Sequence, residues 1–110
     1  MKQKIDNELL DNKKAMNDLA TYQDNSIISR TLLLKESGNV TLFAFDKGQE
    51  LSEHTAPFAA MVYILDGRST IFIDGKKHEL AEGETIIMPA EIPHALKAEE
   101  KFKMLLIMIK

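Results

Sequence analysis

Two stretches decide the fold that the sequence predicts: GQELSEHTAPFAAMVYILDG, residues 48–67, and GETIIMPAEIPH, residues 83–94. Each begins with a glycine and contains one histidine, His54 in the first and His94 in the second. Around them lie short runs rich in β-branched and aromatic residues, separated by glycines beside polar turn formers. This pattern is typical of strands joined by tight turns.

The same pattern continues from residue 25 to residue 110. All five glycines adjoin polar turn formers, and Asp74-Gly75 has the composition of a two-residue hairpin turn. Predicted strands do not alternate with helices, so the pattern does not favour a parallel α/β sheet. Closely spaced short strands are typical of an antiparallel sandwich or barrel. We predict strands near residues 27–34, 39–46, 51–54, 59–65, 69–74, 76–80, 85–88, 94–98 and 102–109.

The first part of the chain has a different character. Residues 2–20 contain neither glycine nor proline, and apolar residues recur there at roughly helical spacing, interrupted at Asn12-Lys13. We expect a short amphipathic helix that packs against another part of the protein. The chain is thus predicted to have an N-terminal helical or extended segment, residues 1–24, and a β-barrel domain, residues 25–110. The apolar positions of the predicted helix are Ile5, Leu9, Met16 and Leu19.

Composition bounds the function. A chain of 110 residues is one ordinary domain. Its net charge of −3 argues against nucleic acid or an anionic membrane surface as a partner. The absence of cysteine excludes disulfides, iron–sulfur clusters and thiol catalysis. The longest apolar run, residues 58–65, is far too short to span a membrane, and the polar N-terminus has no hydrophobic signal region. We expect a cytoplasmic protein.

The last predicted strand is apolar on both faces. In residues 102–109 the even-numbered side chains share one face of the strand, and Leu105, Ile107 and Ile109 share the other. We expect Lys103 to lie at solvent or at a rim. Residues 61–65 have the same character. The outer face must therefore be covered, either by the N-terminal segment or by a second subunit. We predict a homodimer that packs through strand faces.

The two quoted stretches resemble the paired motifs of the cupin superfamily, G-x5-H-x-H-x3,4-E-x6-G and G-x5-P-x-G-x2-H-x3-N. The resemblance runs from residue 48 to about residue 98. It implies an all-β fold, the double-stranded β-helix or jelly-roll barrel. It also implies a metal held inside the barrel by three histidines and one glutamate. The positions in step with the motifs are Gly48, His54, Gly67, Gly83, Pro89 and His94.

The sequence departs from the family pattern at several ligand positions. Ala56 replaces the second histidine, Ala60 (or Met61 at the longer spacing) replaces the glutamate, and Ala98 replaces the terminal asparagine. Of the four metal ligands, only His54 and His94 remain. Two imidazoles are a weak site for a divalent first-row ion, and they do not discriminate among zinc, nickel, manganese and iron.

Three glutamates near the histidines offer a carboxylate as a third ligand. Glu50 has the same strand parity as His54, and Glu53 should face away from it. Glu91 replaces a family glycine in the turn before His94 and could swing over the mouth of the barrel. The sequence does not choose among these carboxylates.

The residues expected on the histidine side would form a mostly apolar ligand pocket. Phe58 has two interpretations, as part of a rigid loop that follows His54 or as a rim residue that stacks on a ligand. His78, beside the predicted hairpin turn, is expected to be a solvated strand residue. The predicted pocket residues are Ala56, Phe58, Ala60, Val62, Leu96 and Met104.

We therefore predict a small single-domain cupin that binds a small molecule, a weakly held divalent metal, or both. The alternative is a metal-dependent cupin enzyme, of dioxygenase, isomerase or decarboxylase type, that uses His54 and His94. The fold alone does not choose among these reactions, and whether the protein is an enzyme stays open at this point. A third possibility is a structural protein whose apolar strand faces serve assembly only.

Overall fold

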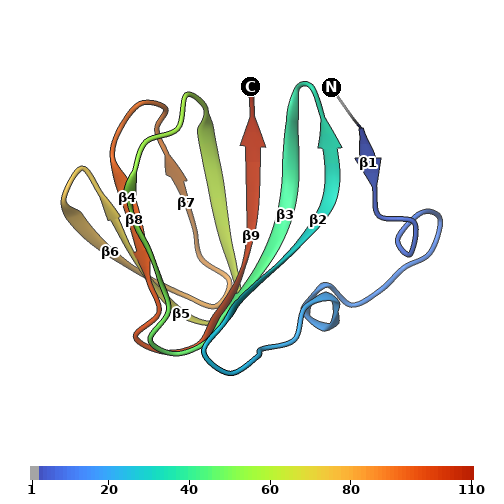
Figure 1. Ribbon diagram of the computed structural model, residues 1–110, viewed down its shortest axis with the longest axis horizontal. Helices are drawn as coiled ribbons and strands as arrows, with labels where there is room; N and C mark the ends of the chain where they lie inside the picture. The colour runs from blue at the N-terminus through green and yellow to red at the C-terminus, as the bar shows by residue number, and fades with distance from the viewer. Residues whose placement is uncertain (1–2) are drawn as a thin grey trace.

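The computed structural model describes residues 3–110, which form an antiparallel β-barrel preceded by an extended N-terminal segment (Figure 1). Every strand pairing is antiparallel. No helix in this part of the chain is long and apolar enough to cross a membrane. The elements are β1 Lys4–Ile5, η1 Met16–Leu19, β2 Ile27–Lys35, β3 Gly38–Phe45, β4 Glu50–His54, β5 Ala59–Ile73, β6 Lys76–Ala81, β7 Thr85–Met88, β8 His94–Lys97 and β9 Phe102–Ile109.

The strands form two sheets that share β5. The first half of β5 lies between β9 and β7, in a sheet that continues through β3 and β2 to β1. The second half lies between β8 and β6, and β4 pairs with the far side of β8. Two antiparallel sheets joined in this way make the jelly-roll barrel that the sequence predicts, so the fold class is confirmed.

The long strand β5 replaces two predicted strands. Asp66-Gly67 was expected to be a turn between residues 59–65 and 69–74, but the chain bends there and remains a strand. Gly67 has φ +74°, and a Cβ on it would lie 2.0 Å from the carbonyl oxygen of Lys101. Close approach of β9 therefore requires glycine at the bend. The predicted Asp74-Gly75 hairpin is confirmed, with positive φ at both residues.

The barrel interior is packed with apolar side chains. The rings of Phe45 and Phe102 stack with their centroids 4.6 Å apart, and both residues are fully buried. Side chains from both sheets alternate inward to fill this core, as expected for strands with one face toward the interior. The buried members of the cluster are Phe45, Ala60, Val62, Ile64, Ile71, Leu80, Met88, Leu96, Ala98, Phe102 and Met104.

The predicted N-terminal helical segment is reduced to a single 3₁₀ turn. From residue 3 to residue 24, the segment has the short strand β1, which pairs with β2, and the turn η1. Leu9, Met16 and Leu19 of this segment pack in the cluster around Leu42, on the outer face of the sheet. A broken apolar stripe gives a helix little stability of its own, so contact with the barrel decides the local conformation. The division of the chain at residues 24 and 25 stays a prediction.

The two apolar faces of β9 are confirmed. Phe102 and Met104 point into the barrel, whereas Leu105 packs on the outer side beneath the N-terminal segment. The expectation for Lys103 is wrong, since it is buried rather than at solvent or a rim. The N-terminal segment covers it, and its Nζ donates to the carbonyl oxygen of Asn17 at 2.7 Å.

Candidate functional site

Two neighbouring strands bring the two motif histidines together. His54 ends β4, His94 begins β8, and the two residues are direct partners in the antiparallel register. Their ring centroids lie 4.3 Å apart with the planes inclined at 67°. The loops after β4 and before β8 lie at the same end of the barrel as the β2–β3 turn and the C-terminus (Figure 1). We call this end the mouth.

Both imidazoles are oriented by backbone carbonyls of their own segments. Nδ1 of His54 lies 2.8 Å from the carbonyl oxygen of Ser52, and Nδ1 of His94 lies 3.3 Å from that of Ile92. A carbonyl oxygen only accepts hydrogen bonds, so each Nδ1 must carry the hydrogen. In the neutral rings, Nε2 is then the atom with a free lone pair. This arrangement of the second ring nitrogen is typical of histidines that bind metals.

The two rings differ in their exposure to solvent. His54 is exposed, whereas His94 is only 6% exposed. Burial is the main cause that lowers the pKa of His94 below its ordinary value, and the nearby His54 lowers it further. The hydrogen bond to Ile92 acts in the opposite direction. His94 is therefore held as a neutral imidazole, the form that binds metals.

A β-bulge in β4 changes which of its side chains face the interior. The register between β4 and β8 shifts between Leu51 and His54. In a regular strand these two residues, three positions apart, would face opposite sides of the sheet. Here Leu51 packs against the core, and His54 pairs with the buried His94. Glu50 therefore lies on the face opposite Leu51 and is exposed. The same parity therefore does not place Glu50 on the face of His54, because the extra residue of a bulge reverses the alternation.

The other two candidate carboxylates do not complete a metal site either. Glu53 and Glu91 are exposed, and residues 3–110 contain no cluster of three or more His, Cys, Asp or Glu side chains that could hold a metal ion. Glu91 instead has a backbone role. It adopts φ +64°, and its N–H donates to the carbonyl oxygen of Ala56 at 2.8 Å, which joins the two loops that carry the histidines. Among residues 3–110, no third side chain of this kind therefore joins the two histidines.

The predicted pocket residues lie in two different places. Ala56 and Phe58 are half-buried in the loop that follows His54, and the ammonium group of Lys110 lies 5.3 Å from the centre of the Phe58 ring. Lys110 was not found by sequence reasoning, because no motif contains it. The remaining four lie deeper, in the packed interior cluster, and are at most 4% exposed: Ala60, Val62, Leu96 and Met104.

The third histidine lies on a different strand from the pair, with β5 between its strand β6 and the strand β8 of His94. His78 lies on β6, where its partner is Ile71, and it is half-buried beside Lys77 and Glu79. It makes no close ring contact with His54 or His94 of the kind that joins those two. His78 is therefore a suitable reference residue for experiments on the pair.

An antiparallel barrel made of two sheets that share a long strand belongs to the class of jelly-roll barrels. Residues 41–110 match the family of cupin domains, and the chain belongs to this family. A search of curated proteins found no match.

Solved structures similar to this chain support the same assignment. A conserved protein of unknown function from Streptococcus pyogenes is 42% identical, with a TM-score of 0.91 over 96% of this chain and 93% of that one. A cupin 2 conserved barrel domain protein from Leptotrichia buccalis is also 42% identical, with a TM-score of 0.85 over 86% of this chain and 46% of that one. A cupin superfamily protein from Desulfitobacterium hafniense is 25% identical, with a TM-score of 0.89 over 96% and 97% of the chains.

Proposed function

We propose that this cupin binds a small molecule at the mouth of its barrel, together with a divalent metal ion held weakly by Nε2 of His54 and Nε2 of His94. The observation that carries the proposal is the paired orientation of the rings, with each Nδ1 tied to a carbonyl and the rings 4.3 Å apart. Two oriented imidazoles form a partial but suitable ligand set for a first-row ion.

The small donor set explains why we propose weak binding. A first-row ion prefers three or more protein ligands, and here no carboxylate of the described residues joins the pair. The remaining coordination positions are left to water or to donor atoms of the bound molecule. When bound, the metal would act as a Lewis acid toward that molecule. The chain itself orients the imidazoles and keeps His94 neutral through burial.

The proposed place for the organic ligand is the mouth rather than the deep interior. His54 is exposed, and Ala56 and Phe58 lie half-buried in the loop that follows it. Deeper in the barrel, Val62 and Leu96 are part of the packed core. A ligand that binds without rearranging the core would thus contact the loop residues and the histidine pair, with the apolar interior as its floor.

The same proposal includes the biological context expected from the sequence. We propose that the protein acts in the cytoplasm as a homodimer, with no nucleic-acid or membrane partner. Exposed apolar side chains on the outer faces of β5 and β7, Met61 and Ile87, support the homodimer.

Titration calorimetry with zinc and nickel tests the metal site. The protein is purified without an affinity tag, stripped of metal, and compared with His54→Ala, His94→Ala and the matched control His78→Ala. We expect one ion per chain in the parent and in His78→Ala, with affinity reduced roughly tenfold or more in each of the other two variants. Binding that persists unchanged in both variants, or that is lost in His78→Ala, would contradict the proposal.

A further inference from the structure

Two polar side chains lie on the inner face of β3, next to the mouth. Leu42 packs in the cluster on the outer face of the sheet, and Phe45 packs in the interior cluster. The register of β3 with β9 is regular over its whole length, so the odd-numbered side chains of β3 face the interior. Asn39 and Thr41 therefore face a barrel interior that is otherwise packed with apolar side chains.

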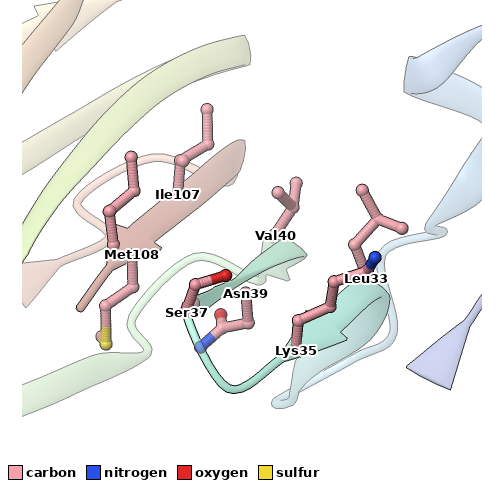
Figure 2. Close-up of a pocket in the computed structure, with 9 residues that line it drawn as sticks. Leu33, Lys35, Ser37, Asn39, Val40, Ile107 and Met108 are labelled. Carbon is pink, nitrogen blue, oxygen red and sulfur yellow. The ribbon is translucent and has the colours of Figure 1, made fainter. Parts of the chain in front are cut away.

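Figure 2 shows the same division of faces at the end of β3. The carboxamide of Asn39 and the side chain of Met108 project to one side of the sheet, and Val40, which packs on the outer cluster, projects to the other. Asn39 and Met108 are direct cross-strand partners, and both are half-buried. Deeper on the same face, Met104 is only 1% exposed. The accessible part of this inner face is therefore the end of β3 and β9 at the mouth.

The histidine pair faces this part of β3 from the opposite sheet. β3 continues into β4 through residues 46–49, and β8 continues into β9 through residues 98–101, both at the end of the barrel opposite the mouth (Figure 1). Because β3 pairs with β9 and β4 pairs with β8, the β4–β8 pair folds back over the β3–β9 pair. Opposed sheets lie about 10 Å apart, so a small molecule of about that length is long enough to contact both Asn39 and the histidines.

Thr41 fixes the orientation of the Asn39 carboxamide. The hydroxyl of Thr41, a residue that is 8% exposed, donates to Oδ1 of Asn39 at 3.2 Å. Because Oδ1 is turned toward this hydroxyl, Nδ2 and its two N–H donors point away from it. The half-buried amide therefore presents hydrogen-bond donors, rather than an acceptor, to a molecule that enters the mouth.

A positive charge lies at the rim of the mouth beside this amide. The N–H of Lys110 donates to the carbonyl oxygen of Ser37 at 2.8 Å, which extends the β3–β9 pairing beyond the last pair of strand residues. The Nζ of Lys110 lies 5.3 Å from the centre of the Phe58 ring, in the loop that leads from β4 to β5. None of the ion pairs among residues 3–110 includes this ammonium group, so its charge is available to a ligand.

We propose that Asn39 and Lys110 bind the carboxylate of a small organic acid whose other end reaches the histidine pair. This inference rests on the proposed function and names the class of its ligand. A carboxylate only accepts hydrogen bonds, and Nδ2 of Asn39 and Nζ of Lys110 only donate them. Oxygen atoms at the far end of the acid would take coordination positions that the two imidazoles leave open.

The charge of this subsite favours a carboxylate over a phosphate group. The Asn39 amide is neutral and the Lys110 ammonium carries one positive charge, which matches the single negative charge of a carboxylate. A phosphate monoester carries about −1.5 to −2 charges at neutral pH and would be only partly neutralised. Between the subsite and the histidines, the half-buried side chains of Met108 and Phe58 offer apolar contact to the carbon chain of the acid.

Titration calorimetry with straight-chain dicarboxylates, from malonate to adipate, tests the subsite in the zinc-loaded and in the metal-free protein. The matched probe is the diamide of the diacid that binds best, because it keeps the length and shape and removes the charge. We expect the diacid to bind roughly tenfold or more tightly than the diamide, since charge-assisted hydrogen bonds are the stronger ones. Inorganic phosphate, titrated into the metal-free protein, should bind more weakly than the diacid.

Two substitutions remove the proposed donors one at a time. Asn39→Leu keeps nearly the same volume and should lower the affinity for the diacid roughly tenfold. Lys110→Met, at an exposed site, should lower it about threefold or more. Gln23→Leu, at an exposed site in the segment before β2, removes an amide away from the mouth and should leave the affinity unchanged. Circular dichroism and zinc titration of all three variants show whether the fold and the metal site are preserved.

Thr41→Val tests the orienting role of the hydroxyl separately. Without it, the Asn39 carboxamide is free to turn Oδ1 toward the ligand and to accept hydrogen bonds from the diamide. We therefore expect the ratio of the diacid affinity to the diamide affinity to fall by roughly threefold or more. A purely structural effect of the substitution would lower both affinities together and leave their ratio unchanged.

The outcomes separate this inference from the proposed metal site. If no diacid binds, or if the affinity is the same in the parent, Asn39→Leu and Lys110→Met, the carboxylate subsite is overturned, whereas zinc binding in the same preparations would still support the metal site. A diamide or phosphate that binds as tightly as the diacid overturns the assigned ligand class. Diacid binding that depends on Asn39, in a protein that binds no zinc, overturns the metal site and supports the carboxylate subsite.

Discussion

His54 and His94 are direct cross-strand partners whose rings lie 4.3 Å apart, yet the first is exposed and the second is 6% exposed. The pair therefore joins solvent to the barrel interior. A cation that binds both Nε2 atoms would be shared between an accessible ring and a buried one. The pair has no carboxylate partner among the described residues, so the ligand set proposed above consists of imidazole nitrogens alone.

A donor set of imidazole nitrogens without a carboxylate predicts a metal preference. Imidazole suits zinc and nickel, whereas manganese favours carboxylate and water, and it binds nitrogen ligands more weakly. We expect affinities for nickel and zinc that exceed the affinity for manganese by roughly an order of magnitude or more. Competition calorimetry on the metal-free protein measures the order. Manganese binding as tight as that of nickel would indicate a carboxylate ligand that the present geometry does not contain.

Gly67 should tolerate no side chain. In Gly67→Ala, a Cβ would meet the Lys101 carbonyl oxygen at 2.0 Å in addition to the strain of φ +74°. We expect the free energy of unfolding to fall by about 3 kcal/mol or more. Urea denaturation measures it. Gly83→Ala is the matched control, with φ +86° and open space around the Cβ, and should lose only about 1 kcal/mol. Equal losses of unfolding free energy in the two variants would show that the close contact with the Lys101 carbonyl oxygen adds nothing to the backbone strain.

The Tyr22 hydroxyl should stabilise the docked N-terminal segment. It donates to the Asp66 carboxylate at 2.6 Å, and burial together with this bond raises the pKa of Tyr22, so the hydroxyl remains a donor at neutral pH. We expect Tyr22→Phe to lower the free energy of unfolding by about 1–2 kcal/mol. Tyr63→Phe, at an exposed site on β5, should change it by less than about 0.5 kcal/mol. Urea midpoints of the two variants give the comparison, and a neutral Tyr22→Phe would contradict the prediction.

The Asp6–Arg30 pair should make docking of β1 sensitive to acid. Arg30 donates to both carboxylate oxygens of Asp6, and these hydrogen bonds lower the pKa of Asp6 below its ordinary value. Because the folded state lowers this pKa, the pair stabilises the docked segment above about pH 4, the range in which an unfolded aspartate is ionised. The contribution is lost as the pH falls through the lowered pKa of Asp6.

Amide hydrogen exchange measures this docking, because the Asp6 N–H donates to the carbonyl oxygen of Leu32 only when β1 is paired. We expect protection of this amide to fall in acid in the parent, and to be low at every pH in Asp6→Asn. Asp18→Asn, at an exposed site in the same segment, should behave as the parent. The same acid dependence in Asp6→Asn and in the parent would exclude the carboxylate as its cause.

The sequence alone predicted those features that neighbouring residues determine. Asp74-Gly75 adopts the positive φ values that its composition favours, and the side chains of β9 alternate between two faces because the strand period is two residues. The spacing of the two motifs was enough to identify the cupin barrel and to single out His54 and His94. These are local patterns, and little outside the segment can change them.

Contacts between distant segments decided the rest. The bulge in β4 sets Glu50 away from His54, because pairing with β8 rather than simple alternation determines the face. The N-terminal segment is not a helix, because burial of separate side chains on the sheet and the Arg30 anchors outweigh a weak helical propensity. The cross-strand register also brings residues as far apart in sequence as Ile5 and Ile87 onto one face of the larger sheet. Register follows from packing of the whole barrel, which no single stretch of sequence contains.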